Sequence, residues 1–209
     1  MTRTYVQRAR ADAVAQTRRA ILAATRTVLV SADRLDVSVG AIADAAGVAR
    51  STIYAAFGTR AGLLAALARK TLAGAGLGDV IAAYRQPDAV TAVESSIRAN
   101  CRMYATDHLV LARLAALAAV DPEAAAPIKD LERERDAAMA DLAARLAAQG
   151  RLRPGLSVDR AAHVLSVVTS FSAFDELHAR RGLDHEACAD VLVDVVRSTL
   201  GDPRPPAGG

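Results

Sequence analysis

The chain has 209 residues, enough to bury a substantial core, and it is rich in alanine, leucine and valine. This composition predicts an all-helical fold, and no apolar run reaches the roughly 18 residues that a membrane span needs. Because two cysteines cannot form a disulfide framework and the N-terminus lacks the apolar core of a signal peptide, we expect a cytoplasmic protein without a membrane partner.

The charge is distributed unevenly along the chain. Residues 1–70 hold eleven Arg or Lys and four Asp or Glu, a net +7, which leaves −4 for the rest of a chain whose total is +3. A basic front on an acidic body is typical of a protein whose N-terminal part binds a polyanion. Arginine-rich helical surfaces also serve solubility, so charge alone leaves both interpretations open.

The first predicted helix spans residues 17–30, where the apolar residues form one stripe. The segment before it carries Arg3, Arg8 and Arg10, and we expect it to be disordered, although basic arms of this kind can reach a minor groove. A second, short helix is predicted over residues 39–46. Residues 31–36 break the pattern between the two helices.

The second helix is bounded by Ser38, a possible N-cap, and by Gly47, which fits a left-handed C-cap. A third short helix is predicted from about Arg50 to Phe57. Gly58 and Thr59 end it, and Thr59 can cap the helix that follows.

A run with three glycines, residues 73–79, weakens any helix there by about 1 kcal/mol for each glycine relative to alanine. We therefore predict a first domain over residues 1–72, with a helix-turn-helix at about 38–57, and a second domain over 79–201. The tail, residues 202–209, is expected to be disordered. Further helices are predicted over about 88–106, 107–119, 122–149 with an interruption at Pro127, 158–180 and 185–200.

Three short helices with a tight glycine turn predict a helix-turn-helix unit, whose third helix enters the major groove of DNA. Residues 17–64 resemble, without a gap, the N-terminal domain of the TetR family of transcriptional repressors. The most specific part is the pattern AxxAGVxxxTIYxxF from Ala43 to Phe57. The resemblance implies an all-α fold, with this DNA-binding domain followed by a larger helical domain for ligand binding and dimerisation.

The resemblance also implies roles for individual residues. Phe57 would turn inward and hold the third helix, while the Tyr54 hydroxyl would bind a DNA phosphate. Tyr54 as plain packing and Arg50 as a solvated charge remain open alternatives. The implied phosphate contacts are Ser38, Thr52, Tyr54 and Arg60, and the implied base contacts are Arg50, Ser51 and Ala55.

The chain departs from the family pattern at several positions. Ala49 stands where a capping serine is usual, so the cap of the third helix is absent or moves to Ser51. Ala56 stands where a histidine or tyrosine would add a backbone contact. Asp33 replaces a glycine and Val37 replaces a threonine.

The larger domain shows no enzyme signature: it has no phosphate-binding glycine loop, HExxH motif or nucleophile elbow. We therefore expect no catalysis and no cofactor. His178, His185 and Cys188 offer too few ligands at close spacing for a metal site, so we favour ordinary helix residues. Cys101 is interpreted as a small core residue rather than a redox sensor.

The family resemblance implies a small-molecule effector in this domain and a homodimer formed through the last two helices. Both helices carry apolar residues on more than one face, which fits a partner on each side. Asn100 on an apolar helix, with Met103 and Tyr104 beside it, could face a cavity, and so could His163, Ser166 and Ser170; these six residues are the candidate ligand site. Satisfied polar groups of the core, or plain surface residues, remain the open alternative.

These features predict a dimeric, ligand-responsive repressor that binds a palindromic operator. The alternative from another class is a helical ligand carrier or small enzyme that has retained a helix-turn-helix core. A carrier has no reason to keep Thr52, Tyr54 and Arg60 together. A DNA-binding activator or nucleoid protein is a further alternative that the sequence leaves open.

Overall fold

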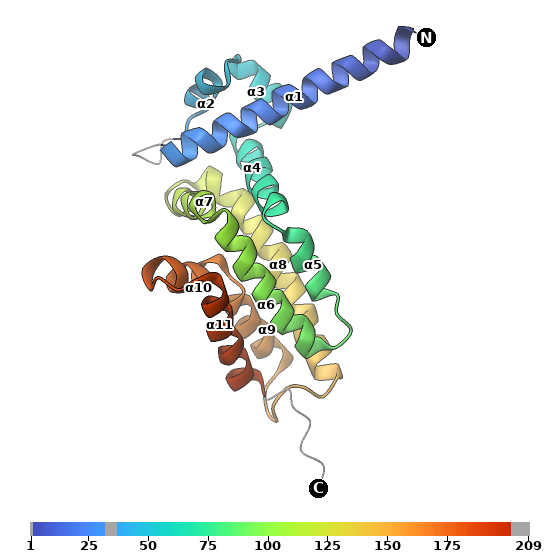
Figure 1. The fold of residues 1–209 in the computed structure, drawn as a ribbon, viewed down its shortest axis with the longest axis vertical. Helices are drawn as coiled ribbons and strands as arrows, with labels where there is room; N and C mark the ends of the chain where they lie inside the picture. The colour runs from blue at the N-terminus through green and yellow to red at the C-terminus, as the bar shows by residue number, and fades with distance from the viewer. Residues whose placement is uncertain (1, 32–36, 202–209) are drawn as a thin grey trace. The chain divides into compact units, whose positions relative to one another are not determined.

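The computed structural model describes residues 2–31 and 37–201, and these residues contain helices, turns and loops but no strand. The all-helical fold is therefore confirmed (Figure 1). The helices group into two compact units. One contains the chain up to Thr71 together with Leu109–Ile128, and the other contains Leu72–His108 together with the chain from Lys129 onward.

The first unit is built on three N-terminal helices and the start of a fourth. Their inward side chains, Ile21, Ile42, Ile53 and Leu63, are fully buried and form its core. The insertion Leu109–Ile128 completes this unit. Its helices are α1 (Thr2–Ser31), α2 (Val39–Ala46), α3 (Arg50–Phe57), α4 (Arg60–Gly74), α7 (His108–Val120) and the first turns of α8 (Pro122–Ala148).

Helix α1 begins at Thr2, so the prediction of a disordered segment around Arg3, Arg8 and Arg10 was wrong. The reason is local propensity: residues 2–16 contain no glycine or proline and are rich in alanine, arginine and glutamine, which favour helix. The predicted break after Ser31 and the substitution at Asp33 lie outside the described residues, as does the tail 202–209.

The second unit packs its helices around a core that includes Ile97, Leu142, Leu165 and Phe174, each 1 % exposed or less. Gly76, with φ of 110°, separates the end of α4 from the next helix, because only glycine adopts this backbone conformation easily. The helices of the unit are α5 (Leu77–Tyr84), α6 (Ala89–Thr106), the rest of α8, α9 (Val158–Val168), α10 (Phe171–Asp175), the π-helical turn η1 (Glu176–Arg180) and α11 (His185–Leu200).

Two predicted boundaries of this part of the chain were wrong. The helix expected over 158–180 is divided at Ser170, whose extended backbone and side-chain oxygen cap α10 by accepting from the Ala173 N–H at 3.1 Å. Conversely, α8 continues through Pro127 without interruption. Pro127 is buried, and its packing offsets the proline's missing backbone hydrogen bond.

Within residues 2–31 and 37–201, no individual helix has both the length and the apolar character needed to span a membrane. Helices α6 and α7 meet that test only when they are counted together across their bend, and on length and composition alone.

Candidate nucleic-acid interface

Helices α2 and α3 are held at a fixed turn by local backbone geometry. The Ser38 hydroxyl accepts a hydrogen bond from the Ala41 N–H at 3.2 Å, so it caps α2 as predicted. Gly47 ends α2 in the left-handed conformation, with φ of 64°. Ala49 starts α3 without a side-chain cap, so the N-cap expected of a serine is absent. This is a helix-turn-helix with one weak helix start.

The two faces of α3 differ sharply in exposure. Ile53 is fully buried and Phe57 is 9 % exposed, so both hold the helix against the core. Tyr54 is 49 % exposed, and Thr52 is half-buried. The remaining predicted contact residues of the turn and of α3 all lie on the exposed surface: Ser38, Arg50, Ser51 and Ala55.

The Arg50 side chain lies over the backbone of α2. Its guanidinium is so close to Gly40 that a Cβ built there would lie 2.7 Å from an Arg50 nitrogen. Gly40 is therefore a close-approach glycine that lets the long side chain rest on the neighbouring helix. Because Arg50 is exposed, it can leave this position when a partner arrives.

Arg18 contacts the end of α3, and the sequence analysis did not predict this contact. It extends from α1 to the end of α3, where it donates to the Ala56 carbonyl and its guanidinium lies 4.0 Å from the centroid of the Phe57 ring. A cation at the carboxyl end of α3 satisfies a free carbonyl and complements the helix dipole. No local sequence signal marks it, since its partner lies 38 residues further along the chain.

Arg60, implied as a phosphate contact, lies instead in a network of internal bonds. Its Nε donates to the Val37 carbonyl at 2.8 Å, and its Nη1 lies 2.7 Å from Asp121 Oδ2 and 3.4 Å from Glu123 Oε2. Its side chain is 16 % exposed. All four residues belong to the first unit.

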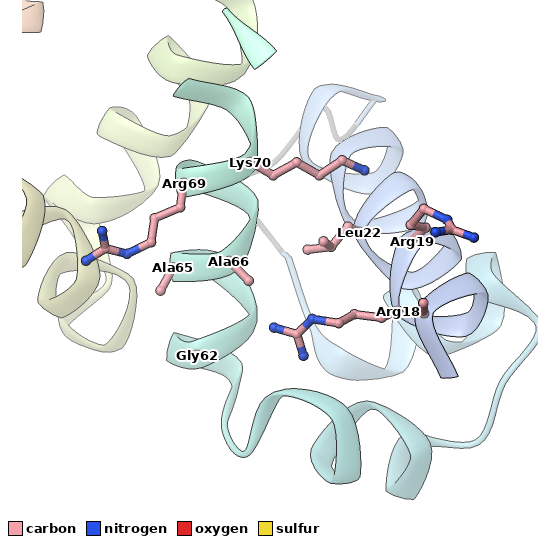
Figure 2. A pocket seen from close by; sticks show the side chains of 9 residues that line it. Arg18, Arg19, Leu22, Gly62, Ala65, Ala66, Arg69 and Lys70 are labelled. Carbon is pink, nitrogen blue, oxygen red and sulfur yellow. The ribbon is translucent and has the colours of Figure 1, made fainter. Parts of the chain in front are cut away.

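A groove of about 630 Å³ lies between α1 and α4 (Figure 2). Figure 2 shows Arg18 and Lys70 extending from opposite helices into the space between them. None of the nine lining residues is acidic, so the groove adds positive potential to a unit whose sequence is already basic. The lining residues are Ala15, Arg18, Arg19, Leu22, Gly62, Ala65, Ala66, Arg69 and Lys70.

In the second unit, the structure divides the predicted ligand site. Asn100, Met103 and Tyr104 lie on the buried face of α6, each 7 % exposed or less, and the Tyr104 hydroxyl donates to the Thr169 carbonyl at 3.0 Å. His163 is exposed on α9, while Ser166 and Ser170 are half-buried. The Ser170 hydroxyl caps α10 and also donates to the Val167 carbonyl. The first three residues therefore share a buried face, from which the exposed His163 is separate.

The same buried face holds a polar residue that the sequence analysis did not select. Ser96, 1 % exposed, precedes Asn100 and Tyr104 at intervals of four residues, and its hydroxyl has no hydrogen-bond partner among the described residues. Within that described part, the other buried polar atom without a partner is Nε of Arg135. The four-residue spacing on one helix was the available signal.

Arg135 and Tyr104 influence each other electrostatically. Burial raises the pKa of Tyr104, and the hydrogen bond and charge of Arg135 partly oppose that rise. The phenol therefore stays neutral at physiological pH and can donate a hydrogen bond. The two unpartnered buried atoms, Ser96 Oγ and Arg135 Nε, call for an explanation, because buried polar groups normally find a partner in the protein, in water or in a ligand.

Two histidines of this unit have structural partners. His178 Nδ1 lies 2.7 Å from the Leu183 carbonyl and its ring stacks on Phe174, while His108 Nε2 lies 2.6 Å from Asp175 Oδ1. Among the residues that the structure describes, no three His, Cys, Asp or Glu side chains gather as a metal site would require.

The two cysteines lie in the core. Cys101 is 1 % exposed and Cys188 is fully buried. Burial raises the pKa of Cys101 to about 12, so its thiol is protonated and unreactive at neutral pH. This placement supports the interpretation of Cys101 as a core residue.

The family comparison matches the N-terminal part of the chain. Residues 21–67 match the model of a family described as bacterial regulatory proteins, tetR family. The match covers α2, α3 and the parts of α1 and α4 that pack with them. No curated protein is similar to this chain at the level of sequence.

Solved structures share the fold over most of the chain. FadR from Bacillus subtilis, solved in complex with stearoyl-CoA, has a TM-score of 0.69 at 17% identity, over 87% of this chain and 98% of its own. NalD from Pseudomonas aeruginosa, described as the secondary repressor of the MexAB-OprM multidrug efflux pump, has a TM-score of 0.68 at 20% identity, over 92% and 99%. Salmonella enterica GusR has a TM-score of 0.65 at 18% identity, over 88% and 95%.

Proposed function

We propose that this chain, a transcriptional regulator of the TetR family, is a repressor that a small-molecule effector releases from a palindromic operator. The observation that carries the proposal is the two-sided character of α3. One side is locked into the core by Ile53 and Phe57, and the other presents Tyr54 and Arg50 on the surface. A rigid helix with a polar, exposed leading edge is what major-groove reading requires.

In this proposal the exposed residues divide into two groups. Arg50 and Ser51 lead the helix and read base edges, with Ala55 against a thymine methyl. Tyr54 and Thr52 bind phosphates and fix the register of the helix, together with Ser38 at the start of α2. The basic first unit supplies the long-range attraction to DNA.

The first prediction separates these two groups. Arg50→Ala should relax the base preference at one operator position, because a bidentate arginine–guanine contact is worth about 1–3 kcal/mol of discrimination. Tyr54→Phe removes only the hydroxyl, and it should weaken binding to all sequences alike. Fluorescence anisotropy on a set of duplexes that differ at single positions measures both effects.

The two variants act as controls for each other, since each removes polar groups from the same exposed helix. The assignment of roles fails if Tyr54→Phe changes base preference, or if Arg50→Ala lowers the affinity for every duplex equally.

The effector site that we propose is the buried polar face of α6, formed by Ser96, Asn100 and Tyr104, with Met103 beside them. The unpartnered Ser96 hydroxyl and Arg135 Nε support it, because an effector with hydrogen-bonding groups would satisfy atoms that the protein leaves free. The FadR structure in complex with stearoyl-CoA shows that this fold accommodates a ligand in another protein. We also propose His163 and Ser166 of α9, and Ser170 at the start of α10, as contacts for an effector that extends beyond α6.

A stability measurement tests whether the Ser96 hydroxyl lacks a hydrogen-bond partner within the protein. Ser96→Ala should raise the free energy of unfolding of the effector-free protein, because it removes a buried hydroxyl whose unpaired burial costs about 1–3 kcal/mol. Chemical denaturation followed by circular dichroism gives the difference.

Ser157→Ala is the matched control for this prediction. The Ser157 hydroxyl caps α9 by accepting from the Arg160 N–H at 3.2 Å, so its loss should destabilise the protein by about 1 kcal/mol. If Ser96→Ala destabilises the protein as Ser157→Ala does, the Ser96 hydroxyl has a partner within the protein and is not available to an effector.

The dimer that we propose uses the outer faces of α9 and α11. The inward residues of α11, Cys188 and Leu192, are buried in the unit, whereas Val191 and Val195 are each 41 % exposed. On α9, Val167 is 65 % exposed. Exposed valines on both helices, four residues apart on α11, fit a symmetric four-helix interface, which would place two copies of α3 on the two halves of a palindrome.

A further inference from the structure

The bonds of Arg60 join three helix starts. Arg60 is the first residue of α4, and Val37, whose carbonyl accepts from its Nε, immediately precedes the cap of α2. Asp121 immediately precedes α8, and its Oδ1 caps that helix by accepting from the N–H groups of Glu123 at 2.9 Å and Ala124 at 3.2 Å. One guanidinium therefore fixes the beginnings of α2, α4 and α8 to one another.

We call the bonds of Arg60 to Val37, Asp121 and Glu123 the bridge. A residue of α8 adds a further bond to it. Glu123 Oε1 accepts from the backbone N–H of Ala61 at 3.3 Å, while its Oε2 lies 3.4 Å from Arg60 Nη1. A carboxylate at the amino end of α4 also complements the helix dipole. The pair of Arg60 and Asp121 is partly buried, with side chains 16 % and 25 % exposed, so solvent screens it less than it screens a surface ion pair.

The bridge is intact at neutral pH. The hydrogen bond from Arg60 is the main cause that lowers the pKa of Asp121 below its usual value of 3.8, and the helix-capping bonds act in the same direction. The carboxylate is therefore ionised wherever the protein would meet DNA.

Helix α3 lies between the elements that the bridge connects. It follows α2 through Gly47 and precedes α4 through Gly58, each in a positive-φ conformation that fixes a tight turn. Helix α8 continues past Ile128 into the second unit, where it carries Arg135. The bridge thus ties the helices on either side of α3 to the start of α8.

We propose that Arg60 is a positioning residue for DNA recognition, which sets the orientation of α3 by tying α2 and α4 to Asp121 and Glu123 at the start of α8, and that it is not a phosphate contact. This inference rests on the proposed DNA-binding function. The family resemblance implies that Arg60 binds a phosphate. The positioning role is based instead on its three bonds and on its low exposure. To turn Nε or Nη1 toward a phosphate, the guanidinium would have to leave two carboxylates and a buried carbonyl.

The test uses Asp121→Asn, a variant on which the two roles make opposite predictions. Asparagine caps helices as well as aspartate does, so the start of α8 is preserved while the charge pair with Arg60 is lost. As a positioning residue, Arg60 needs this partner, so DNA affinity should fall at least about fivefold, the lower end of typical coupling between sites. As a phosphate contact, Arg60 would be released by the same substitution, and affinity should stay constant or rise.

The full-length protein is titrated with the duplex recovered by selection from random DNA, over a series of NaCl concentrations. The variants are Asp121→Asn, Arg60→Gln and the double variant, with Lys70→Gln as a control for the loss of one positive charge on α4. We expect the three bridge variants to lose similar affinity, without additivity, and to keep the wild-type dependence on salt.

A phosphate contact would give a different pattern. Arg60→Gln alone would then weaken binding, and the slope of log K against log[salt] would fall by about 0.9 for each phosphate that the protein no longer neutralises. That result, or unchanged affinity in Asp121→Asn, overturns the inference while leaving the DNA-binding function intact. Absence of salt-dependent binding by the wild-type protein would instead contradict the proposed function itself.

Discussion

Replacing Gly62 with alanine is expected to destabilise the first unit and to weaken DNA binding with it. A Cβ at Gly62 would lie 2.3 Å from the Phe57 carbonyl oxygen, a backbone atom that cannot move without shifting the end of α3. Overpacking of this kind costs about 1–3 kcal/mol, and here it exceeds the gain of up to about 1 kcal/mol in helix propensity. Chemical denaturation gives the stability, and anisotropy gives the DNA affinity.

Gly74→Ala is the matched control, since Gly74 is the last residue of the same helix and a Cβ added there would meet no neighbouring side chain within 4 Å. We expect this variant to be as stable as the wild-type protein or slightly more stable. If the Gly62 and Gly74 variants have equal stability, the close approach of α4 to the end of α3 does not constrain α3.

Charges placed on the outer faces of α9 and α11 are expected to convert the proposed dimer into a monomer. The double variant Val167→Glu/Val195→Glu puts one carboxylate on each helix, and burying unpaired charges in an apolar interface is strongly unfavourable. If each copy reads one half of a palindrome, as proposed, loss of the dimer should lower operator affinity about a hundredfold or more. Size-exclusion chromatography with light scattering measures the mass.

Ile81→Glu provides the control for the dimer prediction. Ile81 lies on α5 of the same unit and is 42 % exposed, which matches the exposure of Val195, but it lies outside the proposed interface. This variant should remain a dimer. A wild-type protein that is monomeric at micromolar concentration, or a double variant that still dimerises, would contradict the assignment of α9 and α11.

The helix-turn-helix could be predicted because its signals are local. Ser38 and Gly47 mark the ends of α2 by chemistry that acts over three or four residues, and Phe57 lies one turn from Ile53 on the inward face. Thr59 caps α4 as expected, accepting from the Gly62 N–H at 2.9 Å.

The polar contacts of Arg18 and Arg60 around α3 could not be predicted, because they join distant parts of the chain. Arg18 meets Ala56 across 38 residues, and Arg60 meets Asp121 across 61. Nothing near either arginine in the sequence distinguishes it from a solvated surface charge. The same limit explains Pro127, where burial within the first unit overrides a local signal for ending a helix.

Selection of bound duplexes from random DNA by the full-length protein tests the central claim most directly. We expect an enriched palindrome, whose half-sites lie about one helical turn apart or a multiple of it, because two copies of α3 would enter successive major grooves. Binding to the enriched duplex should weaken as salt rises. Recovery of no common sequence, or of one without two-fold symmetry, would contradict the claim that α3 reads DNA as part of a symmetric dimer.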